Sequence, residues 1–210
     1  MAFVALYDAN VLYPGSLRDL LVRLGQSGLF QAKWTEQILG EVFSAIVRDQ
    51  PELEGKLART RKLMTEAIAD VRVEGYEPLV ASIELPDPDD RHVLAAAIAC
   101  NAQVIVTANL RHFPDEILAP FDIEAQSPDE FVINVLELAP ARVVSIVKDQ
   151  ARALRQPAMS FEELLDRLRA VGLPRSAAAI NVENSDLCEG EAMAIAVEEV
   201  RTVRRSRRAR

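Results

Sequence analysis

Short apolar runs alternate along this chain with longer segments of helical periodicity, and this alternation limits the folds that the chain can adopt. Residues 3–7, 30–34, 103–107 and 121–125 contain mainly apolar side chains and have the length of buried strands. Strands joined by helix-length segments predict an α/β fold, with a central parallel sheet covered by helices on both faces. In such sheets, ligands bind beyond the carboxyl ends of the strands.

The helical segments of the first two thirds of the chain belong with these strands. Apolar residues three and four positions apart predict helices over 16–24, 35–47, 53–71, 93–100 and 131–138. Residues 1–138 are therefore predicted to form one α/β domain.

The pattern changes after Pro140. Two amphipathic segments, 143–154 and 161–171, predict a helical extension at 139–180, and Ser160 with Glu163 forms a capping box at the start of the second helix. Residues 181–210 are expected to form a tail, acidic at first and Arg-rich at its end, in which 191–203 has the pattern of an amphipathic helix.

Charge and composition exclude several classes of protein. The chain has 210 residues, is 50% hydrophobic and carries a formal net charge of −8, which disfavours a surface made for grasping nucleic acid. Bound divalent cations would offset that charge locally. No apolar stretch reaches the ~18 residues of a membrane span, and no secretory signal is recognised, so a cytoplasmic protein without membrane contact is expected. Cys100 and Cys188 are too few for a disulfide framework or a zinc site.

Acidic and polar residues follow the predicted strands. Asp8 ends the first strand, Thr107 and Asn109 lie at or just after the third, and Asp87, Asp89 and Asp90 precede the helix at 93–100. Carboxylates at such positions are the ligands that Mg²⁺ or Mn²⁺ prefers. The arrangement indicates metal-assisted phosphodiester cleavage rather than hydride or acyl transfer.

Each candidate ligand also has a structural interpretation. Asp8 is the central candidate, although an aspartate at a strand end often bonds a nearby backbone N–H instead. Glu41 borders the apolar face of its helix, where an unpaired charge would be costly and a metal would compensate it; the alternative is an exposed glutamate at the helix edge.

The sequence does not decide which acid of the cluster at 87–90 is the metal ligand. Asp90 is preferred because it directly precedes a buried helix, Asp87 is second, and at least one acid of the cluster is expected to be an N-cap. As supporting residues, Asn10 is expected to hold its loop and Thr107 to hydrogen-bond Asp8. The amide oxygen of Asn109 is expected to hold a metal-bound water.

Other catalytic chemistries lack their motifs. His92 and His112 form no His/Cys constellation, so both are interpreted as surface or loop residues. Nothing in the sequence indicates a nucleophilic serine triad, and no glycine-rich nucleotide-binding loop occurs.

Taken together, these motifs resemble a PIN domain, the metal-dependent ribonuclease fold of VapC-type toxins in toxin–antitoxin pairs. The resemblance covers residues 2–135 and runs through four segments in order: residues 7–12, Glu41, residues 87–97 and residues 106–114. The helical extension is similar to that of a longer VapC subgroup.

The resemblance implies a flavodoxin-like three-layer α/β/α sandwich and a catalytic Mg²⁺ or Mn²⁺ held by Asp8, Glu41 and Asp90. It also implies RNA as substrate and a cognate antitoxin as protein partner, and it is compatible with a homodimer. Family members often carry a fourth acid where this chain has Asn109, which puts a second metal position in doubt.

Two other functions stay open. One is a haloacid-dehalogenase-like phosphatase with Asp8 as nucleophile, although that chemistry wants a second aspartate where this chain has Asn10. The other is a catalytically inactive PIN-like binding module, which Asn109 and the acidic charge favour and the three retained acids disfavour.

Overall fold

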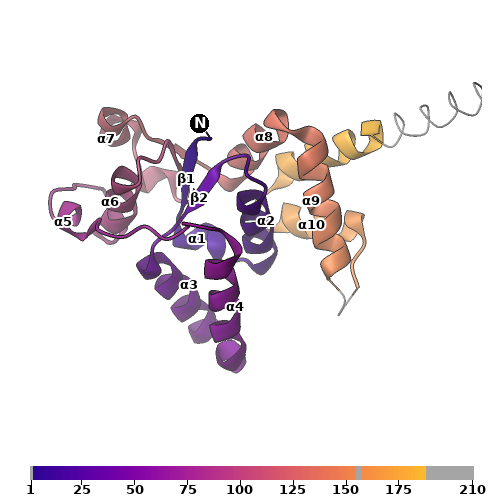
Figure 1. Ribbon diagram of the computed structural model, residues 1–210, viewed down its shortest axis with the longest axis horizontal. Helices are drawn as coiled ribbons and strands as arrows, with labels where there is room; N and C mark the ends of the chain where they lie inside the picture. Colours follow the sequence, from indigo (N-terminus) through magenta and orange to yellow (C-terminus); the bar gives the residue numbers. More distant parts are fainter. Residues whose placement is uncertain (1, 155–157, 188–210) are drawn as a thin grey trace, which may run out of the picture.

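Four parallel strands form the centre of the molecule (Figure 1). The computed structural model describes residues 2–154 and 158–187. The sheet order is β2-β1-β3-β4, made of β1 (Val4–Tyr7), β2 (Gln31–Lys33), β3 (Val104–Val106) and β4 (Glu124–Gln126). In register, Leu6 of β1 pairs with both Lys33 and Ile105. The predicted parallel sheet is confirmed.

The fourth strand begins later than the sequence predicted. Residues Ala119–Phe121 form a 3₁₀ turn instead of a strand, and Asp122 has a left-handed backbone with φ of 55°. A strand cannot pass through that conformation. Regular pairing with β3 therefore begins at Glu124.

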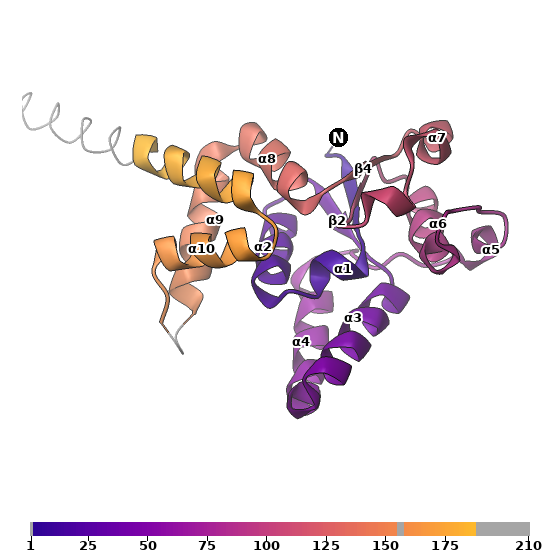
Figure 2. The ribbon, with the colours of Figure 1, turned by 180° about the vertical axis from the view of Figure 1, so that it is seen from behind.

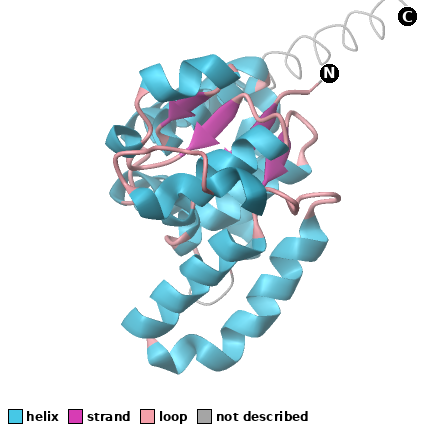
Figure 3. Ribbon diagram, turned by 90° about the vertical axis from the view of Figure 1, so that its left-hand side faces the viewer, coloured by secondary structure: helices cyan, strands magenta, loops and turns pink. Residues whose placement is uncertain are grey.

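Helices cover both faces of the sheet, which gives the three-layer α/β/α sandwich (Figure 3). On one face, α6 (Arg91–Ala99) packs against β1 and β3. On the other face, the Tyr7 hydroxyl donates to the carbonyl of Leu21 at 3.1 Å, and the Tyr7 ring meets that of Phe131 edge to face. These two partners lie on α2 (Gly15–Gln26) and α8 (Pro128–Leu138).

The helices α1 (Ala9–Leu12), α3 (Glu36–Asp49) and α4 (Glu54–Ala67) connect the first strands to the rest of the chain. The pair α3–α4 projects from the sandwich (Figure 1). Helix α4 ends at Ala67, short of the predicted end at 71, and Met64 is its only buried residue. Two short helices lie in the connections: α5 (Glu77–Val80) precedes α6, and α7 (Asp115–Leu118) lies between β3 and β4.

The C-terminal extension packs beside α2 (Figure 2). It contains α9 (Pro140–Ala153), α10 (Phe161–Ala170) and a further helical segment at 174–187. The capping box of Ser160 and Glu163 is present as predicted. Residues 181–187, the start of the predicted tail, continue the last helix, and none of them is fully buried. The helix predicted at 191–203 lies outside the described residues.

One hydrophobic core joins the sandwich and the extension. It includes Leu20 and Leu24 of α2 together with Val143, Leu164 and Ile180 of the C-terminal helices. Within the described residues, no helix has both the length and the apolarity that crossing a membrane requires.

Candidate metal centre

Asp8 is the central residue of the carboxyl edge of the sheet. It directly follows β1 and its backbone N–H donates to the Val106 carbonyl at 3.1 Å. Its side chain is only 4% exposed. One carboxylate oxygen, Oδ1, accepts the Ala9 N–H at 2.6 Å and so caps α1, which is the turn bond that the structural interpretation of Asp8 expected.

The other oxygen of Asp8 is held by the two supporting residues. Thr107 donates its hydroxyl to Oδ2 at 2.7 Å, and the Asn10 amide donates to the same atom at 2.5 Å. Asn10 also accepts the Ala108 N–H at 2.9 Å, while the Asn109 N–H donates to the Thr107 hydroxyl at 3.0 Å. The ends of β1 and β3 are therefore tied together around one carboxylate, with Asn10 holding the loop as expected.

The charge of Asp8 is destabilised where it lies. Its pKa is raised from 3.8 to about 6, chiefly because burial disfavours the charged form and partly because the charge of Asp90 repels it. The Thr107 and Ala9 hydrogen bonds act in the opposite direction, and so would a positive charge on His92. Both Asp90 and His92 therefore lie close enough to Asp8 to affect its ionisation.

Glu41 approaches this edge from α3, which Thr35 starts by accepting the Ile38 N–H at 3.0 Å. The Glu41 side chain is 43% exposed, as its structural interpretation expected, but it is not isolated. Its Oε1 lies 3.0 Å from Nε2 of His92 and accepts the Gln37 side-chain amide at 3.2 Å.

The three acids of the cluster at 87–90 make different contacts. Asp87 caps a 3₁₀ turn, Pro88–Asp90, by accepting the Asp89 N–H at 3.0 Å, whereas Asp89 is exposed. Asp90 stands at the start of α6 and makes no side-chain cap bond there. Instead its Oδ2 lies 2.7 Å from Nδ1 of His112, and Oδ2 of Asp87 lies 3.5 Å from the same nitrogen. Asp87, Asp90 and His112 could together hold a metal ion.

The structure corrects the interpretation of His92, whereas His112 lies in the loop after β3, in agreement with its interpretation. His92 is 4% exposed rather than at the surface, and both histidines contact candidate ligands. One signal in the sequence could have indicated this for His92. The helix that it opens is apolar nearly all round, so a polar residue in its first turn is buried and needs a partner. No local signal identifies the partner of His112.

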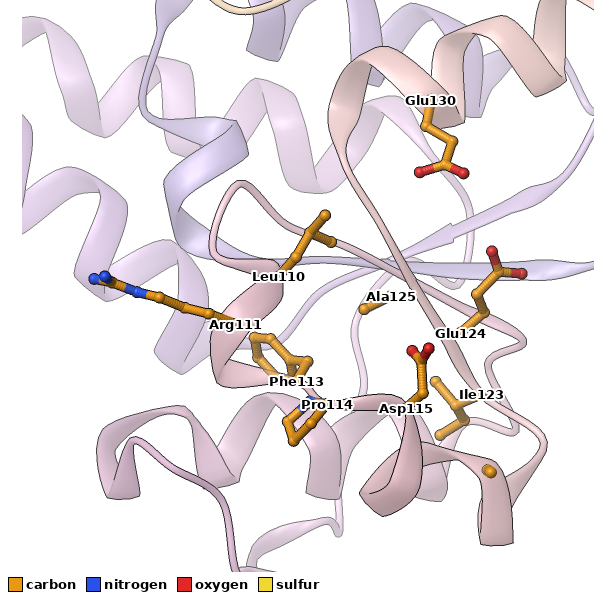
Figure 4. Close-up of a pocket in the computed structure, with 10 residues that line it drawn as sticks. Leu110, Arg111, Phe113, Pro114, Asp115, Ile123, Glu124, Ala125 and Glu130 are labelled. Carbon is orange, nitrogen blue, oxygen red and sulfur yellow. The ribbon is translucent and has the colours of Figure 1, made fainter.

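A cavity of about 680 Å³ lies between the loop at 110–115 and the start of β4 (Figure 4). Leu110, Phe113 and Ile123 line it together with the carboxylates of Asp115, Glu124 and Glu130, whereas Arg111 extends away from them. None of the predicted site residues lines this cavity. Its acidic lining does not suit the phosphates of a nucleic acid.

The donor set fits a hard divalent cation. The carboxylates of Asp8 and Asp90 repel each other, and a cation would neutralise both. Carboxylate oxygens are donors of the kind that Mg²⁺ and Mn²⁺ take.

The comparisons with known proteins agree with this geometry. Residues 4–111, just over half of the chain, match a family model described as "PIN domain". The chain belongs to the PIN-domain family. Residues 128–182 match a second model, described as "VapC50 C-terminal domain". The PIN match contains β1 to β3 with every predicted site residue, and the second match contains α8, α9 and α10.

A relative of this PIN-domain chain is found in Mycobacterium tuberculosis, under the name "Putative ribonuclease VapC50". The two sequences are 40% identical over 94 residues. The alignment covers 45% of this chain and 55% of the relative, so the chain matches about half the length of that protein. No solved structure matches the chain.

Proposed function

We propose that this PIN-domain protein is a metal-dependent endoribonuclease that acts as the toxin of a toxin–antitoxin pair. The observation that carries the proposal is the buried Asp8, whose pKa is raised to about 6 by burial and by the nearby charge of Asp90. Replacing such a carboxylate by a neutral residue would make the fold more stable, because a buried charge is costly. A cation-binding site, in contrast, requires the carboxylate. The name of the mycobacterial relative supports RNA as the substrate, and the family supports a cognate antitoxin as the partner.

In this proposal Asp8, Glu41 and Asp90 hold the Mg²⁺ or Mn²⁺, and Asp87 adds negative charge beside Asp90. When bound, the cation supplies a polarised phosphate and an activated water. Thr107 and Asn10 fix the orientation of the Asp8 carboxylate through Oδ2. Deprotonation of Asp8 must accompany cation binding, because a ligating carboxylate is ionised. Asn109 is proposed to hold a metal-bound water with its amide oxygen.

The two alternative functions have less support. A phosphatase of the haloacid-dehalogenase type needs an acid at the position of Asn10, and here both polar atoms of that amide are engaged with Asp8, Thr107 and Ala108. An inactive binding module does not need two carboxylates that repel each other, as those of Asp8 and Asp90 do.

The test is cleavage of purified total RNA by the protein with Mn²⁺ or Mg²⁺, compared with EDTA. We expect discrete fragments only when the metal is present, and Asp8→Asn is expected to reduce cleavage to the level of the EDTA sample. Asn is preferred to Ala here because Asp8 accepts three hydrogen bonds whose donors are partly buried.

Asp89→Asn is the matched control, since it removes one exposed acid of the same cluster. It should cleave like the unmodified protein. Cleavage that persists in EDTA or in Asp8→Asn would contradict the proposed function, as would the absence of cleavage in protein shown to be free of a co-purified antitoxin.

A further inference from the structure

Two of the three candidate ligands, Glu41 and Asp90, lie next to a histidine. Nε2 of His92 lies 3.0 Å from Glu41, and Nδ1 of His112 lies 2.7 Å from Asp90. In each case the histidine contacts a single oxygen, Oε1 of Glu41 and Oδ2 of Asp90. The second oxygen of each carboxylate therefore stays available for a cation.

The neighbours of His112 determine which ring nitrogen carries the proton. The Arg111 guanidinium lies with Nε 3.2 Å from Nε2 of His112, and a guanidinium only donates hydrogen bonds. Nε2 must then be the acceptor, and the proton of the neutral ring is on Nδ1, directed at Asp90. This tautomer makes His112 a donor to Asp90, and it leaves no lone pair on Nδ1 to bind a metal.

The environment of His92 leads to the same arrangement through the other nitrogen. The ring is almost fully buried, and its Nδ1 is buried with no hydrogen-bond partner among the described residues. A buried N–H without an acceptor is costly, so the proton of the neutral ring belongs on Nε2, which lies 3.0 Å from the Glu41 carboxylate. Because the ring is held by packing in α6, its position is fixed while Glu41 is not.

Such a bond has a clear use at Glu41. A glutamate with 43% of its side chain exposed samples several rotamers, and a flexible ligand loses entropy when it binds a cation. A donor in a rigid helix selects one of these rotamers before the cation arrives.

We propose that His92 and His112 are positioning residues of the metal centre, each holding one carboxylate ligand in place by donating a ring N–H to it. The inference rests on the proposed function, because it takes Glu41 and Asp90 as metal ligands. It assigns to both histidines a role in metal affinity that does not include contact with the metal.

The two histidines use different nitrogens, and this permits a crossed set of variants. The side-chain amide nitrogen of Gln reaches about as far as Nε2 of histidine, and that of Asn about as far as Nδ1. His92→Gln and His112→Asn therefore keep the donor, whereas His92→Asn and His112→Gln misplace it. His92→Leu and His112→Leu remove it, and circular dichroism reports whether each variant folds.

The primary readout is Mn²⁺ binding to the metal-free protein, measured from the EPR signal of free Mn²⁺, with RNA cleavage as the second readout. The donor-keeping variants are expected to stay within about threefold of the unmodified affinity, whereas the misplaced and Leu variants should lose about 10- to 100-fold. Equal affinity in all six variants would overturn the inference, and so would equal loss in the Gln and Asn variants of one position. If His92→Leu fails to fold, the Gln and Asn pair at that position still decides.

A third readout distinguishes positioning from direct ligation. Pulsed EPR of bound Mn²⁺ detects a directly coordinated imidazole nitrogen, and we expect no such coupling. A nitrogen coupling that disappears in His112→Leu would show that His112 is itself a ligand, and would overturn the inference for that residue.

The same samples separate this inference from the proposed function. If the unmodified protein binds no Mn²⁺ and cuts no RNA, both fail. If it does both and Asp8→Asn does neither, while the histidine variants behave like the unmodified protein, only the positioning role fails.

Discussion

Burial raises the pKa of Asp8 in the metal-free protein, and this shift predicts how the stability of the protein depends on pH. The pKa is about 6 in the folded state against 3.8 as the ordinary value. Between these pH values the folded protein holds a proton that the unfolded chain has lost, so the free energy of unfolding falls as pH rises. Above pH 6 the contribution of this group reaches a destabilisation of about 3 kcal/mol.

Urea unfolding in EDTA of the unmodified protein and of Asp8→Asn measures this contribution. The stability of the Asn variant relative to the unmodified protein should increase by about 3 kcal/mol from about pH 4 to about pH 7.5. Asp89→Asn, which changes an exposed acid nearby, should show no comparable trend. A difference between Asp8→Asn and the unmodified protein that does not vary with pH would mean that the charge of Asp8 is already compensated within the chain.

Among individual residues, the sequence predicted the positions of those site residues that directly follow a strand. Asp8 and Thr107 could be placed together because the carboxyl ends of parallel strands meet at one edge. The contacts of His92 with Glu41 and of His112 with Asp90 could not be predicted, because they depend on how α3, α6 and the loop after β3 pack against one another.

At the scale of elements, a buried carboxylate joins α8 to the last helical segment. Asp129 accepts the backbone N–H groups of Arg175 at 3.1 Å and Ser176 at 2.8 Å, and the Ser176 hydroxyl lies 2.7 Å from its Oδ1. Asp129 thus caps the start of the helix at 174–187 from another element, where a negative charge also complements the helix dipole.

Removal of this contact should destabilise the extension. Asp129→Ala leaves two backbone N–H groups without their acceptor, and we expect a loss of about 1–3 kcal/mol in the free energy of unfolding. Asp129→Asn keeps an acceptor oxygen and should lose less. Glu130→Ala, at the next position of the same helix turn, is the matched control with little effect. Equal stabilities for Asp129→Ala and Glu130→Ala in urea unfolding would refute this capping role.

The same contact explains why the last helix was not fully predicted. Its buried side chains at 176, 177 and 180 are Ser, Ala and Ile, a weak apolar pattern, and its cap lies more than forty residues away in the sequence. The strands and the helices with larger apolar faces were predicted, with bounds that differ by a few residues, because their periodicity is local. An element that depends on a distant partner gives no such signal.

At the scale of the molecule, the sandwich and the extension form a single core and are expected to unfold together. Besides sharing the apolar core, they are joined by Gln150 of α9, whose buried side chain donates to the Ser16 carbonyl at 2.9 Å. Truncation after residue 138 would expose the face of α2 that α9 and α10 cover. Exposure of apolar surface of that kind lowers stability by about 25 cal/mol for each Å².

The single tryptophan makes this cooperativity measurable. Trp34 is buried at the end of β2 and stacks on Tyr7, so its fluorescence reports the sandwich, whereas far-UV circular dichroism reports the helices of both parts. We expect the two probes to give one urea midpoint in the full chain. A chain of residues 1–138 should unfold at lower urea by both probes. Two separate midpoints in the full chain, with the fluorescence midpoint unchanged by truncation, would show instead that the PIN domain is stable without its extension.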